Sequence, residues 1–219
     1  MKIYTFLSEA QREMYEKYFL SSLPTEFDVN TTFHNDSYIE PESAYYSLGH
    51  PCPEFTERMK MKAIFMKKTC EKNFGDIIVF ADADLQFFGP LKKTLIEELG
   101  NLDMVCQQDD MWSVSRKLCG GLMVCRCNTH TLKLFTQIEK NFRIDDQVAL
   151  NDQKNICKHK ALPMEQFFTV GHVLGRQWWK EVNFSIPQSI LVHHASWTLG
   201  IENKMKLLEI VKKRVHNRK

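Results

Sequence analysis

The feature that most constrains the fold is a continuous apolar run that ends in two acidic residues. Residues 76–81, Asp-Ile-Ile-Val-Phe-Ala, are followed directly by Asp82, Ala83 and Asp84. An apolar run without alternation is typical of a strand that is covered on both faces, as in α/β proteins. In open α/β sheets the ligand crevice lies at the carboxyl ends of the strands, so the two carboxylates are predicted to face it.

Helix and strand signals alternate on either side of this run. Residues 2–7 and 27–33 are predicted strands, joined by a helix that begins after Ser8 and ends near Leu20, which indicates a parallel βαβ unit. Later strands are expected at 104–106, 118–126, 167–170 and 190–193, later helices at 56–70, 91–99, 128–142 and 205–219, and an irregular stretch at 35–54. The predicted class is α/β, with a Rossmann-like, mostly parallel central sheet flanked by helices and a less regular C-terminal third.

The charge of the chain is nearly balanced overall but uneven along its length. Its 219 residues suit one large domain, and 29 Lys and Arg against 27 Asp and Glu give a net charge of +2. This balance argues against nucleic-acid binding, which needs clustered positive charge. In residues 203–219, seven basic residues minus one acid leave a local charge of +6. We expect this basic tail to be a helix docked on the domain, with weak contact to an acidic membrane surface as the alternative.

The ends and the cysteines of the chain bear on its compartment. Residues 1–9 hold one lysine and a short apolar run, which is typical of neither a signal peptide nor a membrane anchor, and no later window approaches a transmembrane segment. The seven cysteines include no CxxC pair and are expected to be buried free thiols. These features predict a soluble, cytoplasmic protein.

The acidic pair is a candidate metal site. Asp82 and Asp84 repel each other when both are ionised, and a hard cation such as Mg²⁺ or Mn²⁺ would offset that repulsion. A solvated turn or a helix N-cap are the alternatives. A phosphatase of the haloacid dehalogenase type would carry Thr or Val two residues after the second acid, where this chain has Gln86. The sequence therefore favours a metal-dependent site of another class.

Four segments of the chain resemble one family in the same order. Residues 79–90, Val-Phe-Ala-Asp-Ala-Asp-Leu-Gln-Phe-Phe-Gly-Pro, are followed by 120–126, 145–151 and 193–200, with Lys204 behind the last. Together they resemble the nucleotide-diphospho-sugar glycosyltransferases with a DxD motif and the GT-A fold. Small domains of this family occur in large algal viruses, where they glycosylate capsid protein, and the compact chain is similar to those. If it is viral, the host cytoplasm is its expected location.

The resemblance implies a metal site and a diphosphate site. Asp84 would be the main ligand of Mn²⁺ or Mg²⁺, with Asp82 as its partner and His194 as the third ligand. His193 is the alternative, because adjacent residues of a strand point to opposite faces and only one of the two can face the metal. Lys204 would hold the diphosphate. Imidazole, carboxylates and diphosphate oxygens are a plausible ligand set for Mn²⁺.

The resemblance also implies where the nucleotide sugar binds. Backbone groups at the end of the first strand would contact the nucleobase. Arg58 and Lys62 would reach a phosphate or the base, and two glycines would let the sugar approach the chain. For Arg58 and Lys62 a solvated basic helix is the alternative, and for the glycines a β-bulge. The full set implied for the donor is Thr5, Phe6, Leu7, Arg58, Lys62, Asp82, Ala83, Gly120, Gly121, Gly200 and Lys204.

Two residues are implied in catalysis. Asp146 would lie nearest the anomeric carbon, as general base in an inverting enzyme or steering an ion-pair-like step in a retaining one. Gln147 would hold a sugar hydroxyl. One of the two acids at 145–146 is also suited to cap a helix. His172 and residues 178–179, Trp-Trp, would form an acceptor wall or cover the core.

The predicted function is metal-dependent transfer of a hexosyl, deoxyhexosyl or pentosyl group from a UDP-sugar to a hydroxyl of a saccharide or of a glycoprotein glycan. Residues 1–204 would form one GT-A-like domain, with a nucleotide-binding half at 1–106 and an acceptor half at 107–204, followed by a basic helix at 205–219. One alternative is a nucleotidyltransferase, although residues 8–11, Ser-Glu-Ala-Gln, lack the glycines and cations expected after its first strand. The other is a non-catalytic module that binds nucleotide sugars.

Overall fold

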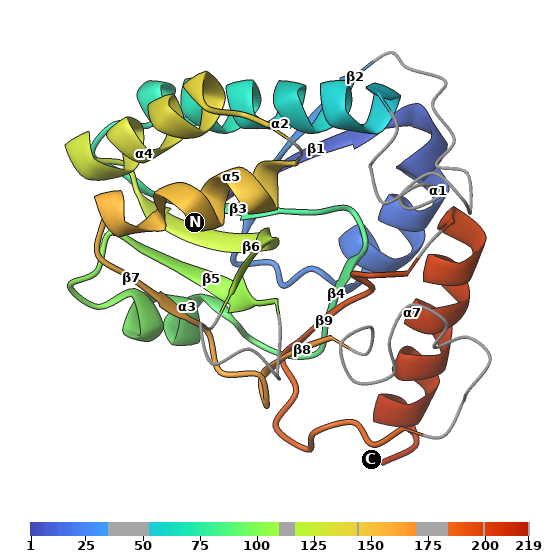
Figure 1. Ribbon diagram of the computed structural model, residues 1–219. Helices are drawn as coiled ribbons and strands as arrows, with labels where there is room; N and C mark the ends of the chain where they lie inside the picture. The colour runs from blue at the N-terminus through green and yellow to red at the C-terminus, as the bar shows by residue number, and fades with distance from the viewer. Residues whose placement is uncertain (35–52, 110–116, 144, 170–183, 199, 219) are drawn as a thin grey trace.

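The computed structural model describes residues 1–34, 53–109, 117–143, 145–169, 184–198 and 200–218 (Figure 1). Within these ranges it has nine strands: β1 (Lys2–Ser8), β2 (Asp28–His34), β3 (Ile77–Ala81), β4 (Leu85–Phe87), β5 (Met104–Gln108), β6 (Leu118–Arg126), β7 (His159–Ala161), β8 (Phe167–Thr169) and β9 (Val192–His194). Its longer helices are α2 (Pro53–Lys72), α3 (Lys92–Leu99), α4 (Thr129–Lys140), α5 (Asp146–Gln153) and α7 (Ile201–His216). None of the helices in the described ranges is long and apolar enough to cross a membrane.

Six strands form the central sheet in the order β2-β1-β3-β6-β5-β7 (Figure 1). β1 pairs in parallel with β2 and β3, and β5 pairs in parallel with β7, whereas β6 is antiparallel to both of its neighbours. Five of the six strands therefore run in one direction, which confirms the mostly parallel sheet. The parallel pairing of β1 with β2 confirms the predicted βαβ unit.

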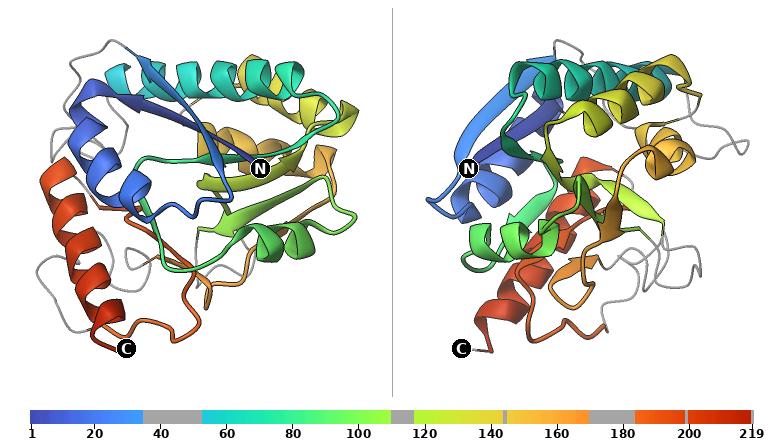
Figure 2. Two further views of the ribbon diagram at one scale, coloured as in Figure 1. Left: turned by 180° about the vertical axis from the view of Figure 1, so that it is seen from behind. Right: turned by 90° about the vertical axis from the view of Figure 1, so that its left-hand side faces the viewer.

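Helices cover both faces of this sheet and enclose two apolar cores (Figures 1 and 2). α2, α4 and α5 pack on one face, around a core that includes Phe80 and Phe135. The segment around α1 (Arg12–Met14), α3 and α7 cover the other face, around a core that includes Phe19 and Leu208. Alternate side chains of β3 enter the two cores, so every position of this strand must be apolar.

A second, three-stranded sheet continues the chain after the acidic pair. Its order is β4-β9-β8, with β4 antiparallel to β9 and β9 parallel to β8. The sequence did not predict β4, because a strand of three residues is too short to show a periodic pattern. Leu85 pairs with His194 in this sheet, so the acidic pair lies beside the histidine segment from more than 100 residues later.

The segment after β1 differs from its prediction. It begins after Ser8, whose N–H donates to Gln11 Oε1 at 3.0 Å, but it is not one regular helix to Leu20. A 3₁₀ turn precedes α1, and a π-helical turn at Tyr15–Phe19 and a second 3₁₀ turn follow it. Ser8 as an N-cap predicted a helix here, but the sequence carried no signal for its irregular winding.

α7 begins four residues earlier than the predicted basic helix, at Ile201, so Lys204 lies in its first turn. Leu207, Leu208 and Val211 are fully buried in the core beneath it. These contacts confirm that the helix is docked on the domain.

Some predictions concern residues outside the described ranges. The irregular stretch at 35–54 falls outside them except for its last two residues, and His172 and residues 178–179 fall outside entirely. Six of the seven cysteines are described, and all six are buried and free, which agrees with the prediction for those six.

Candidate active site

A cavity of about 500 Å³ lies at the carboxyl ends of β1 and β3. Phe6 of β1 and residues of α2 line one side, and the beginnings of β6, α5 and α7 contribute to the other. Between them lie Asp82, Ala83 and Asp84, the turn that joins β3 to β4. The acidic pair thus faces the crevice, where ligands of open α/β sheets bind.

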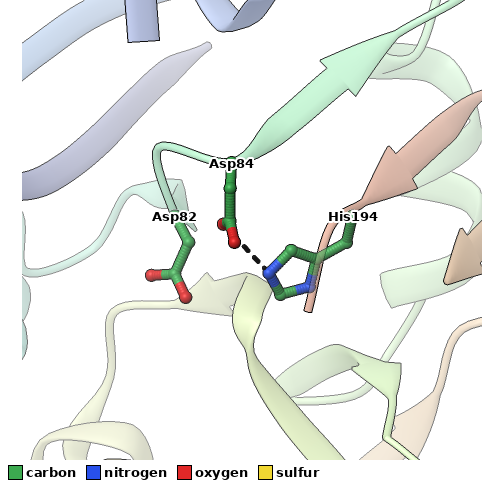
Figure 3. A group of neighbouring side chains, drawn as sticks. All are labelled: Asp82, Asp84 and His194. Carbon is green, nitrogen blue, oxygen red and sulfur yellow. Dashed lines mark ion pairs between the residues drawn. The ribbon is translucent and has the colours of Figure 1, made fainter. Parts of the chain in front are cut away.

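Asp82, Asp84 and His194 form a cluster of possible metal ligands (Figure 3). One ligand atom from each of the three lies within 4.8 Å of the other two. His194 Nε2 is 3.1 Å from Asp84 Oδ1, and both side chains are almost fully buried. The turn after β3 supplies both acids, and β9 brings in the histidine through its pairing with β4.

The surroundings of His194 direct its Nε2 at the acids. Gln107 Nε2 donates to Phe167 O at 3.1 Å, which turns Gln107 Oε1 toward His194 Nδ1 at 2.9 Å. Nδ1 therefore carries the ring proton and donates it to Gln107 Oε1. Nε2 of the neutral ring is then an acceptor that faces a second acceptor, Asp84 Oδ1, and this contact is favourable only when a proton or another cation lies between them. This donor set fits a divalent cation. The sequence did not predict this contact of Gln107, which lies outside the four segments that resemble the family.

Lys204 neutralises Asp84 in this structure. Its Nζ lies 3.0 Å from Asp84 Oδ2, on the oxygen that His194 does not contact. Burial alone raises the pKa of Asp84, but the Lys204 ammonium and the His194 imidazole outweigh that effect and hold the pKa well below its usual range. Gly200, at φ +80°, precedes α7, and its carbonyl accepts the Lys204 N–H at 3.0 Å.

A second lysine joins Asp82 to Asp146. Lys62 Nζ lies 2.7 Å from Asp82 Oδ1 and 2.8 Å from Asp146 Oδ2. Burial lowers the pKa of Lys62, but Asp146 and Asp82 outweigh it, so the pKa is raised above its usual value. Asp145 caps α5 by accepting the Val148 N–H at 2.6 Å, which leaves its neighbour Asp146 to face the cavity.

Arg58 is also buried on the cavity side of α2. It donates to Gln11 Oε1 at 2.6 Å. Lys62 is buried on the same face of the helix, and both side chains line the cavity. The alternative of a solvated basic helix is therefore wrong for this pair.

The two glycines of β6 lie where side chains of the site approach the backbone. A Cβ on Gly120 would stand 2.9 Å from Asp146 Oδ2, and a Cβ on Gly121 would overlap the His194 ring. The β5–β6 register shifts here, as in a bulge, and Gly121 O accepts the Asp82 N–H at 2.8 Å. In this structure the missing side chains of Gly120 and Gly121 leave room for the Asp146 carboxylate and the His194 ring.

His193 takes no part in the cluster. It points to the opposite face of β9, and Gln86 Nε2 lies 3.1 Å from its Nδ1. Burial, with the charge of His194, lowers the pKa of His193 to about 3. The alternation of strand side chains thus places His194, and not His193, beside the two acids.

The remaining predicted residues are divided between cavity and core. Phe6, Ala83 and Gln147 line the cavity. The side chains of Thr5 and Leu7, on the other face of β1, are fully buried away from it.

Comparisons with known proteins concern most of the chain. A family model described as nucleotide-diphospho-sugar transferase matches residues 33–208. No curated protein sequence matches the chain.

Solved structures share its fold at low identity. A glycosyltransferase involved in glycosylation of the major capsid of PBCV-1 has a TM-score of 0.61 at 8% identity, covering 96% of this chain and 100% of that one. The bifunctional glycosyltransferase WbbM has a TM-score of 0.60 at 10% identity over 97% of this chain, which spans 51% of WbbM. An active-site mutant of LgtC has a TM-score of 0.54 at 12% identity, with 95% of each chain covered. At such identities the likeness concerns the fold alone.

Proposed function

The chain belongs to the family of nucleotide-diphospho-sugar transferases, and we propose that it transfers the sugar of a UDP-sugar to a saccharide hydroxyl with a divalent cation at Asp82, Asp84 and His194. The family supplies the reaction class and the GT-A-like fold agrees with it. The single observation that carries the finer proposal is the convergence of these three side chains beside Lys204 in one cavity. Mn²⁺ is the favoured ion, with Mg²⁺ as the substitute.

The two carboxylates and His194 Nε2 would hold the cation. When bound, it would neutralise the charge that develops on the departing diphosphate. Gln107 keeps the imidazole in the orientation that this role needs, through the 2.9 Å contact with Nδ1.

Lys204 would have one partner before the diphosphate binds and another afterwards. In the free protein its ammonium neutralises Asp84. A diphosphate beside Asp84 offers the ammonium more negative charge than one carboxylate, and the cation then neutralises the acid in its place. We therefore assign Lys204 to the β-phosphate.

Asp146 and Gln147 are assigned to the transferred sugar. Lys62 and the bare backbone at Gly120 fix the Asp146 carboxylate at the cavity wall. In an inverting reaction this carboxylate takes the proton of the acceptor hydroxyl, and in a retaining one it stabilises the positive charge at the anomeric carbon. Gln147, which also lines the cavity, would bind a sugar hydroxyl.

The two halves of the chain would divide the substrates. Phe6 and Arg58, from residues 1–106, line the side of the cavity assigned to the nucleoside, and Asp146 comes from residues 107–204, assigned to the sugars. The acceptor proposed is a saccharide, free or on a glycoprotein.

The test is Mn²⁺-dependent release of UDP from a panel of UDP-sugars, with and without saccharide acceptors. Asp84→Asn should lower the rate at least about 100-fold, because it removes one charge from the proposed cation site. The matched control is Asp76→Asn, the same change at an exposed acid just before β3, which should leave the rate unchanged. Release that needs no divalent ion, or that survives Asp84→Asn, would contradict the metal role. A chain that binds UDP-sugars but turns none over would be a binding module instead.

A further inference from the structure

Trp197 has a strained backbone at the edge of the cavity. Among the described residues it is the non-glycine residue with positive φ, +58°, a conformation that bulky side chains rarely adopt. Such strain costs about 1–3 kcal/mol and persists only where neighbouring contacts hold it, most often at ligand sites. The Trp197 side chain is partly exposed and lines the cavity.

Contacts from two sides hold the turn that contains Trp197. Its indole Nε1 donates to Asp109 Oδ1 at 2.9 Å, at the end of β5. Two residues earlier, the Ala195 N–H donates to Asp84 O at 3.0 Å. The indole is therefore fixed relative to both the acidic pair and the edge of β5.

The strand order gives the position of Trp197 along the cavity. From β1 outward the edge presents Phe6, then Asp84 after β3, then Gly120 of β6 with Asp146 against it, then Asp109 after β5 with the indole. β5 lies two strands from β3, on the side away from β1, so Asp109, which holds the indole, lies on that side of the acidic pair.

This order matches the order of the parts of a sugar-transfer complex. If the nucleoside lies at β1, the diphosphate at Asp84 and the donor sugar at Asp146, the acceptor must lie on the far side of the donor sugar. We propose that the Trp197 ring, fixed by Asp109, is a stacking platform for a sugar ring of the acceptor. The negative face of the indole attracts the C–H groups on the flat face of a pyranose. This inference rests on the proposed function.

The test uses Trp197→Gly and Trp197→Phe. Glycine adopts φ +58° without strain, so the strain that Trp197→Gly relieves offsets part of the cost of losing the indole–Asp109 hydrogen bond, and the variant should still fold, which thermal unfolding checks. The probes are the methyl glycosides of β-D-galactose, β-D-glucose, β-D-xylose, α-D-mannose and α-L-fucose, presented with UDP and Mn²⁺. Binding is measured by saturation-transfer NMR, and the acceptor KM by UDP release.

We expect at least one glycoside to bind the unchanged protein and to bind Trp197→Gly about tenfold more weakly, with most affinity retained in Trp197→Phe. The UDP affinity, the donor KM and the slow hydrolysis of UDP-sugar in the absence of acceptor should not change. The proposal is overturned if no glycoside binds, if Trp197→Gly binds them as the unchanged protein does, or if only the donor KM moves. If Trp197→Gly loses glycoside binding but the unchanged protein turns over no UDP-sugar, the acceptor subsite is supported and the proposed function is refuted.

Discussion

The cavity contains two lysines, Lys62 and Lys204, which pair with different carboxylates and differ in their burial. Lys62 lies within α2, is fully buried between Asp82 and Asp146, and touches both at less than 3 Å. Lys204 lies in the first turn of α7, is more exposed, and its Nζ lies 3.0 Å from Asp84 Oδ2. We call Lys62, Asp82 and Asp146 the Asp146 group, and Asp84, His194 and Lys204 the Asp84 group.

The difference indicates which part of the site is fixed and which part exchanges partners. Asp84 contacts both His194 and Lys204, so it would retain His194 if Lys204 moved away, and the proposed function requires such an exchange of Lys204 for the divalent cation. Within the described part of the chain Asp146 contacts one cation, Lys62, and its separation from Lys62 would leave a buried charge unpaired. We therefore expect the Asp146 group to have a structural role besides its proposed catalytic one, and ligand binding to change the contacts of the Asp84 group.

The largest effect expected is on stability, at Lys62. Lys62→Met should lower the free energy of unfolding of the metal-free protein by about 3–5 kcal/mol, because it leaves the buried Asp146 and the partly exposed Asp82 without their cation. Lys204→Met should cost less, since Asp84 retains His194. The control is Lys67→Met on the same helix, whose pair with Glu139 is partly exposed and should be worth less than about 1 kcal/mol. Urea unfolding measures all three, and equal losses for Lys62 and Lys67 would contradict the comparison.

The next effect separates the two glycines of β6. Gly121→Ala should displace the His194 ring and lower Mn²⁺-dependent UDP release by about 100-fold, as small misplacements of catalytic groups do. Gly120→Ala meets only the end of the Asp146 side chain and should disturb Mn²⁺ binding less than Gly121→Ala does. Isothermal titration with Mn²⁺ in the presence of UDP measures the affinity. If the two variants bind Mn²⁺ equally well, the account of His194 is wrong.

A smaller effect concerns the coupling between metal and nucleotide. Because Lys204 competes with the cation for Asp84, Mn²⁺ should bind the free protein weakly and about tenfold more tightly once UDP is present. Lys204→Met should tighten Mn²⁺ binding in the absence of UDP and remove most of this coupling, whereas Lys62→Met should retain the coupling. Lys206→Met, an exposed change on the same helix, is the charge-matched control. Equal coupling in all three variants would show that Lys204 does not exchange partners.

The smallest effect expected is that of pH between 5 and 9 on the free energy of unfolding of the metal-free protein. The raised pKa of Lys62 means that its stabilisation is complete below its unfolded pKa of about 10.4 and is lost only as pH rises through the higher folded pKa. The lowered pKa of Asp84 means that its stabilisation is present above its unfolded pKa of about 3.9 and is lost as pH falls through the lower folded pKa. The differences between the unchanged protein and Lys62→Met or Asp84→Asn should therefore stay constant in this window. A difference that changes near neutrality would point to another titrating group.

The sequence predicted best where one local signal decided the outcome. The uninterrupted apolar run required a strand buried on both faces, and Asp82 and Asp84 followed from its end. The choice of His194 over His193 needed the pairing of β9 with β4, and strands of three residues are too short for the sequence to predict how they pair. The bond between Lys62 and Asp146 joins helices more than 80 residues apart, and no local pattern encodes it. Trp197 was within a matched segment, but its backbone strain is set by Asp109 and Asp84 and cannot be seen in the sequence.

The most direct test of the central claim is a crystal structure with UDP and Mn²⁺, in which the anomalous scattering of manganese locates the ion. We predict one peak within bonding distance of an Asp84 oxygen and of His194 Nε2, with Lys204 Nζ moved from Asp84 to the diphosphate and Lys62 still on Asp146. A peak elsewhere, or a Lys204 that stays on Asp84 with the nucleotide bound, would contradict the account.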